Sequence, residues 1–197
     1  EPEAEAPLAT PKIALAAGTA EQTLMNEAKG IHKSALTLDA HADIELPGQP
    51  SSYVGPDGLS KVAPAKMRAG GLDAVVMAIA VGPRPRTTEG YASALNTAQE
   101  ELAAVTALAA DPANNAVIAT SVEELLAAHE NEQLALLLGM QNALILGTDL
   151  TLLDSFYDQG VRVFALTHMG HNDFADSSRT IMVGDTGRRE APAEHGG

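Results

Sequence analysis

The chain contains no cysteine and no tryptophan, and aromatic residues make up only 3% of its 197 residues. Without cysteine there can be no disulfide, no thiolate ligand and no cysteine nucleophile, so any metal must be held by histidine, carboxylate or amide groups. The hydrophobic fraction of 45% is normal for a globular protein, and with so few aromatic side chains the core must be aliphatic. This length suits one substantial domain or part of a larger one.

Positive charge is also scarce, with 12 Lys and Arg residues against 26 Asp and Glu residues and a net charge of -14. This balance argues against a nucleic-acid partner and against docking on anionic lipid, because both require a basic face. No apolar run approaches the roughly 20 residues needed to cross a bilayer, so we expect no direct membrane insertion. The sequence also lacks a Gly-rich phosphate loop, a Gly-x-Ser-x-Gly elbow and a His-Glu-x-x-His helix, which leaves nucleotide-binding, serine-hydrolase and zincin functions without support.

The first residues, Glu1 to Lys12, are rich in Ala, Pro and Glu and show no apolar periodicity. We interpret them as a mature terminus left after removal of an export signal, or as a tether behind one, which predicts an exported, periplasmic or cell-surface protein. A trimmed sequence explains them nearly as well and is compatible with a cytoplasmic protein. We therefore place a flexible lead or tether at residues 1–20 and the folded domain at residues 21–197.

Apolar segments alternate with segments of helical periodicity, which is typical of a parallel α/β architecture. The apolar runs are nearly unbroken, as in strands that are buried on both faces of a parallel sheet. Ser121 and Glu124 form a capping box at one helix start, and Gly70, Gly71 and Gly160 are typical helix stops. The pattern predicts strands at residues 35–39, 72–81, 116–119, 134–140 and 161–167, and helices at residues 21–34, 61–69, 88–110, 121–130 and 149–159.

Four of these strands end at polar residues or at a loop that contains them, namely at His41, Gly82, Gln141 and His168. The carboxyl ends of parallel strands are where both (β/α)8 barrels and open α/β sheets place their active sites. The sequence therefore predicts a functional site that collects side chains from these strand ends.

The first strand end, Asp39-Ala-His41-Ala-Asp43, has a histidine and an aspartate two residues apart. Side chains at i and i+2 of an extended chain point the same way, so an imidazole nitrogen and a carboxylate oxygen can converge on a divalent metal of the zinc type. The same spacing also suits a turn in which Asp39 and Asp43 bind backbone amides and His41 is only solvated.

Three segments together resemble the membrane dipeptidase family of zinc peptidases, also called renal dipeptidases. They are residues 38–44, residues 138–157 and residues 160–177, with supporting matches at residues 66–71 and 194–197, so the resemblance runs from about residue 31 to the last residue. The resemblance implies a distorted (β/α)8 barrel that holds two zinc ions at the carboxyl ends of its strands and hydrolyses dipeptides.

The resemblance also implies roles for four residues. His41 and Asp43 match ligands of the first zinc, Gln141 falls where the family has a glutamate that bridges both zinc ions, and His168 matches the histidine that contacts the substrate and its developing oxyanion. The implied mechanism is attack of a metal-bound hydroxide on the peptide carbonyl of a small dipeptide. We consider a homodimer possible.

Two departures from the family pattern change these expectations. The Gln141 amide offers one neutral oxygen where a carboxylate offers an anionic oxygen to each of two cations, so the second metal can be weakly bound or absent. The protein can then be a dipeptidase, another metal-dependent amidohydrolase, or a non-catalytic relative; alternatively Gln141 is a loop amide that bonds nearby backbone. Family members also continue for about as long again, so we expect this chain to be an N-terminal half that is inactive and unstable alone.

A separate metal site could also be formed by the loop that carries His168, His171, Asp173 and Asp176. The loop has no helical phasing that would make these groups converge, so we expect ordinary loop roles for the last three. The loop that carries Arg84 and Arg86 follows a strand end and could reach the predicted site, although surface roles are the simpler expectation.

Overall fold

The computed structural model describes residues 15–46, 49, 51–179, 182–183 and 188–189, which belong to two compact units divided after Ala35. The first unit contains helix α1 (Leu15–Ser34), which begins earlier than the predicted Glu21 and exposes its side chains from residue 18 onwards. Residues 1–14 of the predicted lead lie outside the described residues, and the domain boundary after residue 20 stays a prediction. None of the described helices is both long enough and apolar enough to cross a membrane.

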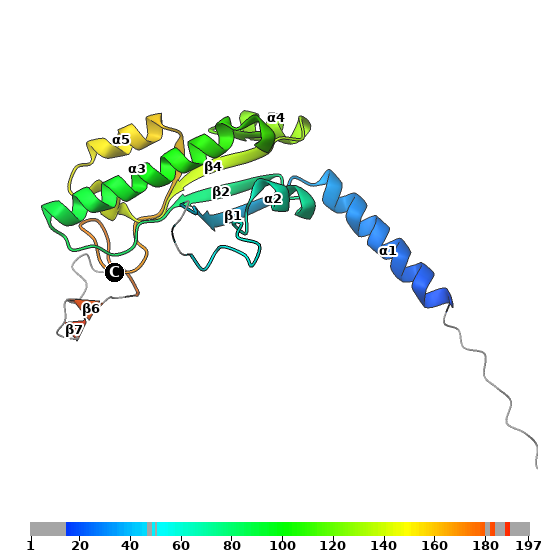
Figure 1. The fold of residues 1–197 in the computed structure, drawn as a ribbon, viewed down its shortest axis with the longest axis horizontal. Coiled ribbons are helices and arrows are strands. Elements are labelled where there is room, and N and C mark those ends of the chain that lie inside the picture. Colours follow the sequence, from blue (N-terminus) through cyan, green and yellow to red (C-terminus); the bar gives the residue numbers. More distant parts are fainter. Residues whose placement is uncertain (1–14, 47–48, 50, 180–181, 184–187, 190–197) are drawn as a thin grey trace, which may run out of the picture. The chain divides into compact units, whose positions relative to one another are not determined.

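The second unit is built around a parallel α/β sheet, as the sequence predicts (Figure 1). Strand β2 lies between β1 and β4, and the other edge of β4 pairs with β3 along its first half and with β5 along its second half. The four strands β1, β2, β4 and β5 therefore follow one another in space in the order of the chain. The strands are β1 (Leu38–Asp43), β2 (Ala74–Ile79), β3 (Ala116–Ile118), β4 (Leu134–Met140) and β5 (Val161–Phe164).

Helices connect these strands close to the predicted positions, and short segments complete the fold. The connecting elements are α2 (Pro64–Gly70), α3 (Thr88–Ala110), the 3-10 turn η1 (Pro112–Asn114), α4 (Val122–Glu130), the 3-10 turn η2 (Ala143–Leu146) and α5 (Thr151–Asp158). A short antiparallel pair, β6 (Met182–Val183) and β7 (Arg188–Arg189), follows. The ends of α2 and α5 confirm the predicted glycine stops, because Gly71 and Gly160 have φ angles of 69° and 102° that favour glycine.

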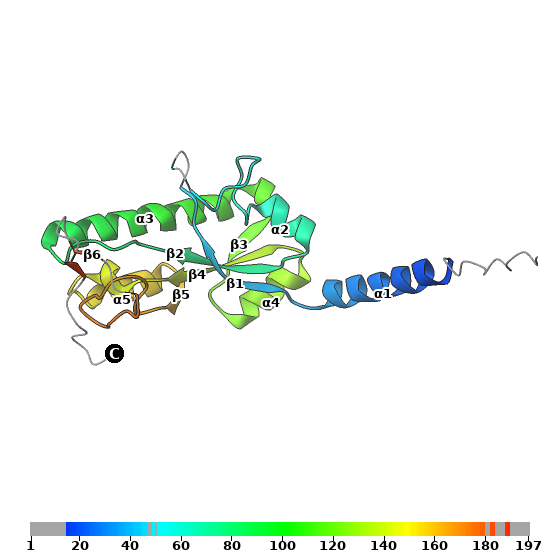
Figure 2. The ribbon, with the colours of Figure 1, turned by 90° about the horizontal axis from the view of Figure 1, so that it is seen from below.

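The two faces of the sheet carry different side chains because successive residues of a strand point to opposite sides. On one face Val75, Met77 and Ile79 of β2 join the large side chains of β4 and the buried stripe of α3 in the main core. On the other face small residues such as Ala74 and Ala135 pack with Ala128 of α4. Figure 2 shows α3 running along one side of the sheet and α4 on the opposite side. The core is aliphatic, as predicted, and β2 is buried along its whole length.

Strand β1 differs from the prediction in position and in burial. It spans Leu38–Asp43, so His41 and Asp43 lie inside the strand and not after its end, and Leu38 is 46% exposed. Ala35 and Leu36, which were predicted to begin the strand, precede it. The reason is the pairing with β2, which starts at Leu38 and continues through Asp43 with an irregularity between Asp39 and Ala42. Among the described strands β1 pairs only with β2, so part of its surface stays exposed.

Asp73 links the starts of β1 and β2 to the last turn of α4. Its Oδ2 accepts hydrogen bonds of 2.7 Å from both the amide and the hydroxyl of Thr37, and its Oδ1 lies 3.2 Å from Nδ1 of His129 on α4. Burial raises the pKa of Asp73, but these hydrogen bonds outweigh it and leave the pKa below its usual value. The starts of β1 and β2 are thereby fixed, which leaves the opposite, carboxyl-terminal ends to carry a site.

Candidate functional site

A cavity of about 350 Å³ lies at the carboxyl-terminal end of the sheet. It contains all four residues that the sequence predicts for the site: His41 and Asp43 of β1, Gln141 directly after β4, and His168 in the segment after β5. Its remaining lining comes from β1 and the β1–α2 connection, namely Asp39, Ala42, Tyr53, Ser60, Lys61 and Val62. The topology therefore brings together side chains that are up to 127 positions apart, from 41 to 168.

His41 and Asp43 converge, as their spacing predicts. Nε2 of His41 lies 3.3 Å from Oδ1 of Asp43, and the side chains are 50% and 21% exposed respectively. This Oδ1 atom is buried and has no hydrogen-bond partner in the described part of the chain. A buried carboxylate oxygen is costly when it is left unpaired. An imidazole nitrogen and an oxygen in this arrangement fit a divalent cation such as zinc.

Asp39 behaves as the alternative interpretation of the same stretch predicts. Its Oδ1 accepts the backbone amide of His41 at 3.0 Å, which holds the local turn of the strand. Asp43 instead faces the Tyr53 hydroxyl, and hydrogen bonding to Asp43 together with its negative charge raises the pKa of that phenol. The two aspartates thus have different tasks: Asp39 supports the backbone, whereas Asp43 points its oxygens at the cavity.

Gln141 is fixed through its backbone while its side chain stays at the cavity. Its amide donates a 3.0 Å hydrogen bond to the carbonyl of Ile79 at the end of β2. No hydrogen bond joins its side-chain amide to any residue in the described ranges, so these residues give no support to the alternative of a loop amide that bonds nearby backbone. A side-chain oxygen that lines a cavity without an internal partner is available to a ligand.

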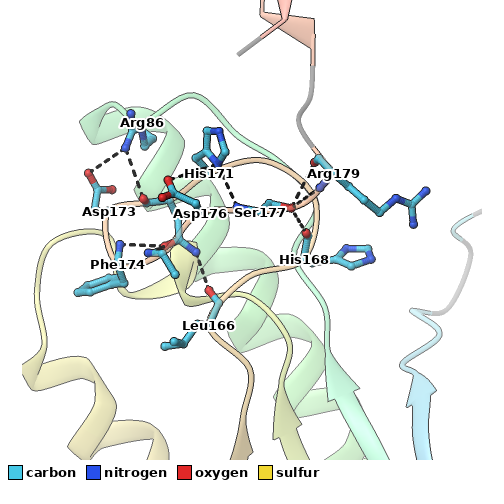
Figure 3. Close-up of polar contacts among 11 residues, drawn as sticks. Arg86, Leu166, His168, His171, Asp173, Phe174, Asp176, Ser177 and Arg179 are labelled. Atoms are coloured by element: carbon cyan, nitrogen blue, oxygen red, sulfur yellow. Dashed lines mark hydrogen bonds and ion pairs between the residues drawn. The ribbon is translucent and has the colours of Figure 1, made fainter. Parts of the chain in front are cut away.

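His168 lines the cavity from a loop that is held by its own polar contacts (Figure 3). The hydroxyl of Ser177 donates to the carbonyl of His168 at 2.5 Å, and the amide of Ser177 donates to Nδ1 of His171 at 3.0 Å. Figure 3 shows that the imidazoles of His168 and His171 point in different directions. The loop therefore fixes the backbone of His168 and leaves its side chain exposed.

The other polar residues of this loop do not form a metal site with His168. Nδ1 of the buried His171 lies 3.5 Å from Oδ1 of the buried Asp176, while Asp173 accepts the Tyr91 hydroxyl at 2.6 Å and lies 3.8 Å from Arg86. Across the described ranges, no group of three or more histidine, cysteine, aspartate or glutamate side chains is arranged to hold a metal. Of the three predicted metal ligands only His41 and Asp43 are of these residue types, and Gln141 lines the same cavity.

Two buried asparagines that the sequence analysis missed connect the strand ends. Nδ2 of Asn142 donates to the carbonyl of Val81 at 3.2 Å, and its Oδ1 accepts Nδ2 of Asn172 at 3.1 Å. Asn172 also donates to the carbonyl of Leu166 at 2.6 Å. Asn142 follows Gln141 directly, and this adjacency to a strand end is the signal that could have identified it. The pair sets the positions of the segments that carry Gln141 and His168.

Glu101 of α3 is a buried carboxylate next to the site, only 7% exposed, and it lines a neighbouring cavity of about 210 Å³ together with Asp43 and Tyr53. Its Oε2 accepts the amide of Ala80 at 2.7 Å, directly after β2. Burial raises the pKa of Glu101 to about 7, and the charge of Asp43 adds to this, whereas the Ala80 amide and Arg84 oppose it. The residue thus changes charge near neutral pH.

We predict that Glu101→Gln stabilises the full-length, metal-free protein at pH 8 and not at pH 4.5. The folded pKa lies above the unfolded one, so stability falls as the pH rises from about 4.5 to about 7 and is constant above that. Glutamine keeps an acceptor for Ala80 and removes this loss, which is on the order of 1–3 kcal/mol. Urea unfolding across this range measures the effect, and exposed Glu100→Gln is the matched control. An equal pH dependence in wild type and Glu101→Gln would contradict the prediction.

A family model described as membrane dipeptidase (peptidase family M19) matches residues 25–191 of the chain. The family consists of metal-dependent peptidases. A search of curated proteins found no match.

Solved structures of similar proteins share the fold. The probable dipeptidase PvdM from Pseudomonas aeruginosa is 29% identical with a TM-score of 0.71, and the match covers 80% of this chain and 41% of that one. An amidohydrolase from Pseudomonas aeruginosa (18% identity, TM-score 0.53) matches over 75% of this chain and 38% of that one. A metallopeptidase described as dipeptidase AC (18% identity, TM-score 0.52) matches over 66% of this chain and 42% of that one. The fold is thus that of the N-terminal part of a (β/α)8 barrel, and the chain spans about two fifths of the length of these proteins.

Proposed function

Because the chain belongs to the membrane dipeptidase family, we propose that the protein is a zinc-dependent dipeptidase whose reaction takes place in the cavity lined by His41, Asp43, Gln141 and His168. The observation that carries the proposal is the buried Oδ1 of Asp43, which has no hydrogen-bond partner among the described residues and lies 3.3 Å from Nε2 of His41. This pair offers one nitrogen and one oxygen to a cation, the donor types that zinc prefers when cysteine is absent. The name of PvdM, a probable dipeptidase, supports the same activity.

Each residue has a proposed task in peptide hydrolysis. His41 and Asp43 would hold one zinc, and Gln141 would face a second zinc with a neutral oxygen. Zinc, when bound there, supplies Lewis-acid polarisation of the peptide carbonyl and lowers the pKa of water. The exposed imidazole of His168 would donate a hydrogen bond to the carbonyl oxygen of the substrate as negative charge develops on it. Ser177 keeps the backbone of His168 in place for this contact.

We expect the zinc-loaded, full-length protein to hydrolyse members of a broad dipeptide panel, and His168→Ala to lower kcat by about 100- to 1,000-fold. The loss should fall mainly on kcat, because the proposed hydrogen bond strengthens as charge develops on the oxygen. Chromatographic detection of the released amino acids measures both the cleavage of the panel and the change in kcat. His171→Ala is an unsuitable control because His171 is buried and accepts the amide of Ser177, so exposed His32→Ala serves instead. Absence of cleavage across the whole panel would refute the dipeptidase activity.

A second candidate, a non-catalytic relative, is favoured by one observation. The residue after β4 is an amide, Gln141, where the family resemblance places a bridging carboxylate, and an amide cannot give an anionic oxygen to each of two cations. A relative of this kind would bind metal weakly and hydrolyse no dipeptide. The Gln141→Glu variant separates the two candidates.

A further inference from the structure

Among the described residues that line the cavity, Lys61 is the single lysine or arginine. The other ionisable residues of the lining are Asp39, His41, Asp43, Tyr53 and His168, of which the first three belong to β1. The chain as a whole carries a net charge of -14, which repels anionic ligands. A cation in the lining of an acidic protein's cavity therefore favours anionic ligands there.

The backbone holds Lys61 in position. Residues 53–61 fold back on themselves, with an antiparallel bridge between Val54 and Ser60 and a 3.0 Å hydrogen bond from the Lys61 amide to the Tyr53 carbonyl. A second lysine, Lys66 of α2, fastens this segment by donating to Oδ1 of Asp57 at 2.9 Å and to the carbonyl of Leu59 at 3.1 Å. The base of the Lys61 side chain is thus fixed by contacts far from its own charge.

Lys61 forms no ion pair with any carboxylate of the described residues. Its Nζ lies 5.6 Å from the centre of the Tyr53 ring, whereas Lys66 is paired with Asp57. A cation placed over an aromatic face at an exposed site gains only about 0.5–1 kcal/mol, less than a hydrogen bond to a carboxylate. An anion in the cavity would therefore be the stronger partner.

We infer that Lys61 binds a carboxylate of the peptide substrate, so that the cavity selects anionic peptides. The inference rests on the proposed function for the identity of the substrate as a peptide. Two carboxylates have the right chemistry: the terminal carboxylate of the dipeptide and an acidic side chain. Both would place an oxygen against Nζ while the peptide bond lies among His41, Asp43 and His168 in the same cavity.

The test compares Lys61→Met, Lys61→Arg and the control Lys29→Met in the zinc-loaded, full-length protein; Lys29 is an exposed residue of α1 that does not line the cavity. The substrates are Ala-Ala, Ala-Gln, Ala-Glu, Glu-Ala and Ala-Ala amide. Lys61→Met should raise KM about 10- to 100-fold for the peptides that carry the bound carboxylate, with kcat within about twofold. Lys61→Arg should keep most of the affinity, and Lys29→Met should leave KM unchanged.

The pattern of KM values identifies the carboxylate. A rise for Ala-Glu or Glu-Ala without a rise for Ala-Ala and Ala-Gln assigns the acidic side chain. A rise for all four dipeptides, with no rise for Ala-Ala amide, assigns the terminal carboxylate. A KM that Lys61→Met leaves within twofold of wild type for every substrate overturns the inference while leaving the dipeptidase proposal intact.

A binding measurement keeps the inference testable if no dipeptide is cleaved. Calorimetric titration with glutarate, a dicarboxylate without a peptide bond, should show binding that Lys61→Met weakens about 10-fold or more and Lys29→Met leaves unchanged. That result would support Lys61 as the anion-binding residue although the proposed hydrolysis had failed. Glutarate binding that is absent, or equal in all three proteins, would overturn the inference in that case.

Discussion

Replacing His41 with alanine is expected to lower the zinc affinity of the full-length protein by more than about 100-fold. The change removes the nitrogen that lies 3.3 Å from the buried Oδ1 of Asp43, which has no hydrogen-bond partner among the described residues. Loss of a residue that only supports a metal ligand typically costs 10- to 100-fold in affinity, so loss of a ligand itself should exceed this. Equilibrium dialysis against a competing chelator, followed by elemental analysis, measures the change.

The control for this variant is His32→Ala on α1, which removes an exposed imidazole that does not line the cavity. It should bind zinc like the wild type. Circular dichroism should show both variants folded, because the His41 side chain is half exposed and contributes little to packing. If His41→Ala retained wild-type zinc affinity, the metal site would have to lie elsewhere and the roles proposed for Asp43 and Gln141 would fall with it.

The strand ends show how far the sequence predicts the site. The apolar runs of β2 and β4 predict their own burial, and the rule that parallel strands end at one edge predicts that Gln141 and His41 meet. Each strand can be predicted from its own residues, and the parallel arrangement alone then brings the strand ends together. The predicted position of β1 was wrong. The pairing register with β2 decides where this strand begins, and the sequence around Leu36 does not indicate that register.

The two aspartates of the first strand end have different surroundings. Asp39 accepts a backbone amide, as a turn residue does, while Oδ1 of Asp43 accepts none and faces His41. Spacing could not separate them, because both aspartates stand two residues from His41. The difference arises from pairing: the irregularity between Asp39 and Ala42 lets the chain fold locally at Asp39, and Asp43 returns to register opposite Ala78.

Contacts between distant segments explain what the sequence could not predict. Lys61 was predicted to begin a helix, but the helix starts at Pro64, and Lys61 instead closes the fold of residues 53–61 against Tyr53. Asn142 and Asn172 meet through a hydrogen bond across 30 positions of sequence. Polar residues of this kind have no periodicity, so their partners become visible only when the strands are in place.

Gln141→Glu is expected to raise the affinity for a second zinc by at least about 10-fold. The change is nearly isosteric and places a negative charge at the cavity, where the amide now has only a neutral oxygen to offer. Opposite unit charges about 4 Å apart attract by about 4 kcal/mol at an effective dielectric constant of 20, and desolvation of the carboxylate cancels part of that. A remainder of about 1.4 kcal/mol corresponds to the tenfold gain. Zinc stoichiometry and affinity are measured by titration calorimetry.

The sign of the stability change provides an independent check on this variant. Without zinc, a new carboxylate in the cavity that already contains Asp43 should lower the melting temperature, because like charges repel there. With saturating zinc the same carboxylate should raise it, because ligands that bind the folded state stabilise it. Gln133→Glu adds the same charge just before the opposite end of β4 and should show neither zinc-dependent change. An unchanged second-zinc affinity in Gln141→Glu would contradict the prediction.

The activity of Gln141→Glu then separates the two candidate functions, because affinity and turnover need not change together. If the wild type cleaves dipeptides and the variant cleaves them faster, Gln141 weakens a working binuclear site. If only the variant cleaves them, the wild type is a relative that has lost the reaction through this one amide. If the second-zinc affinity rises but the variant cleaves dipeptides more slowly than the wild type, the catalytic geometry depends on the neutral oxygen of Gln141, and the enzyme works with a single tightly held zinc at His41 and Asp43.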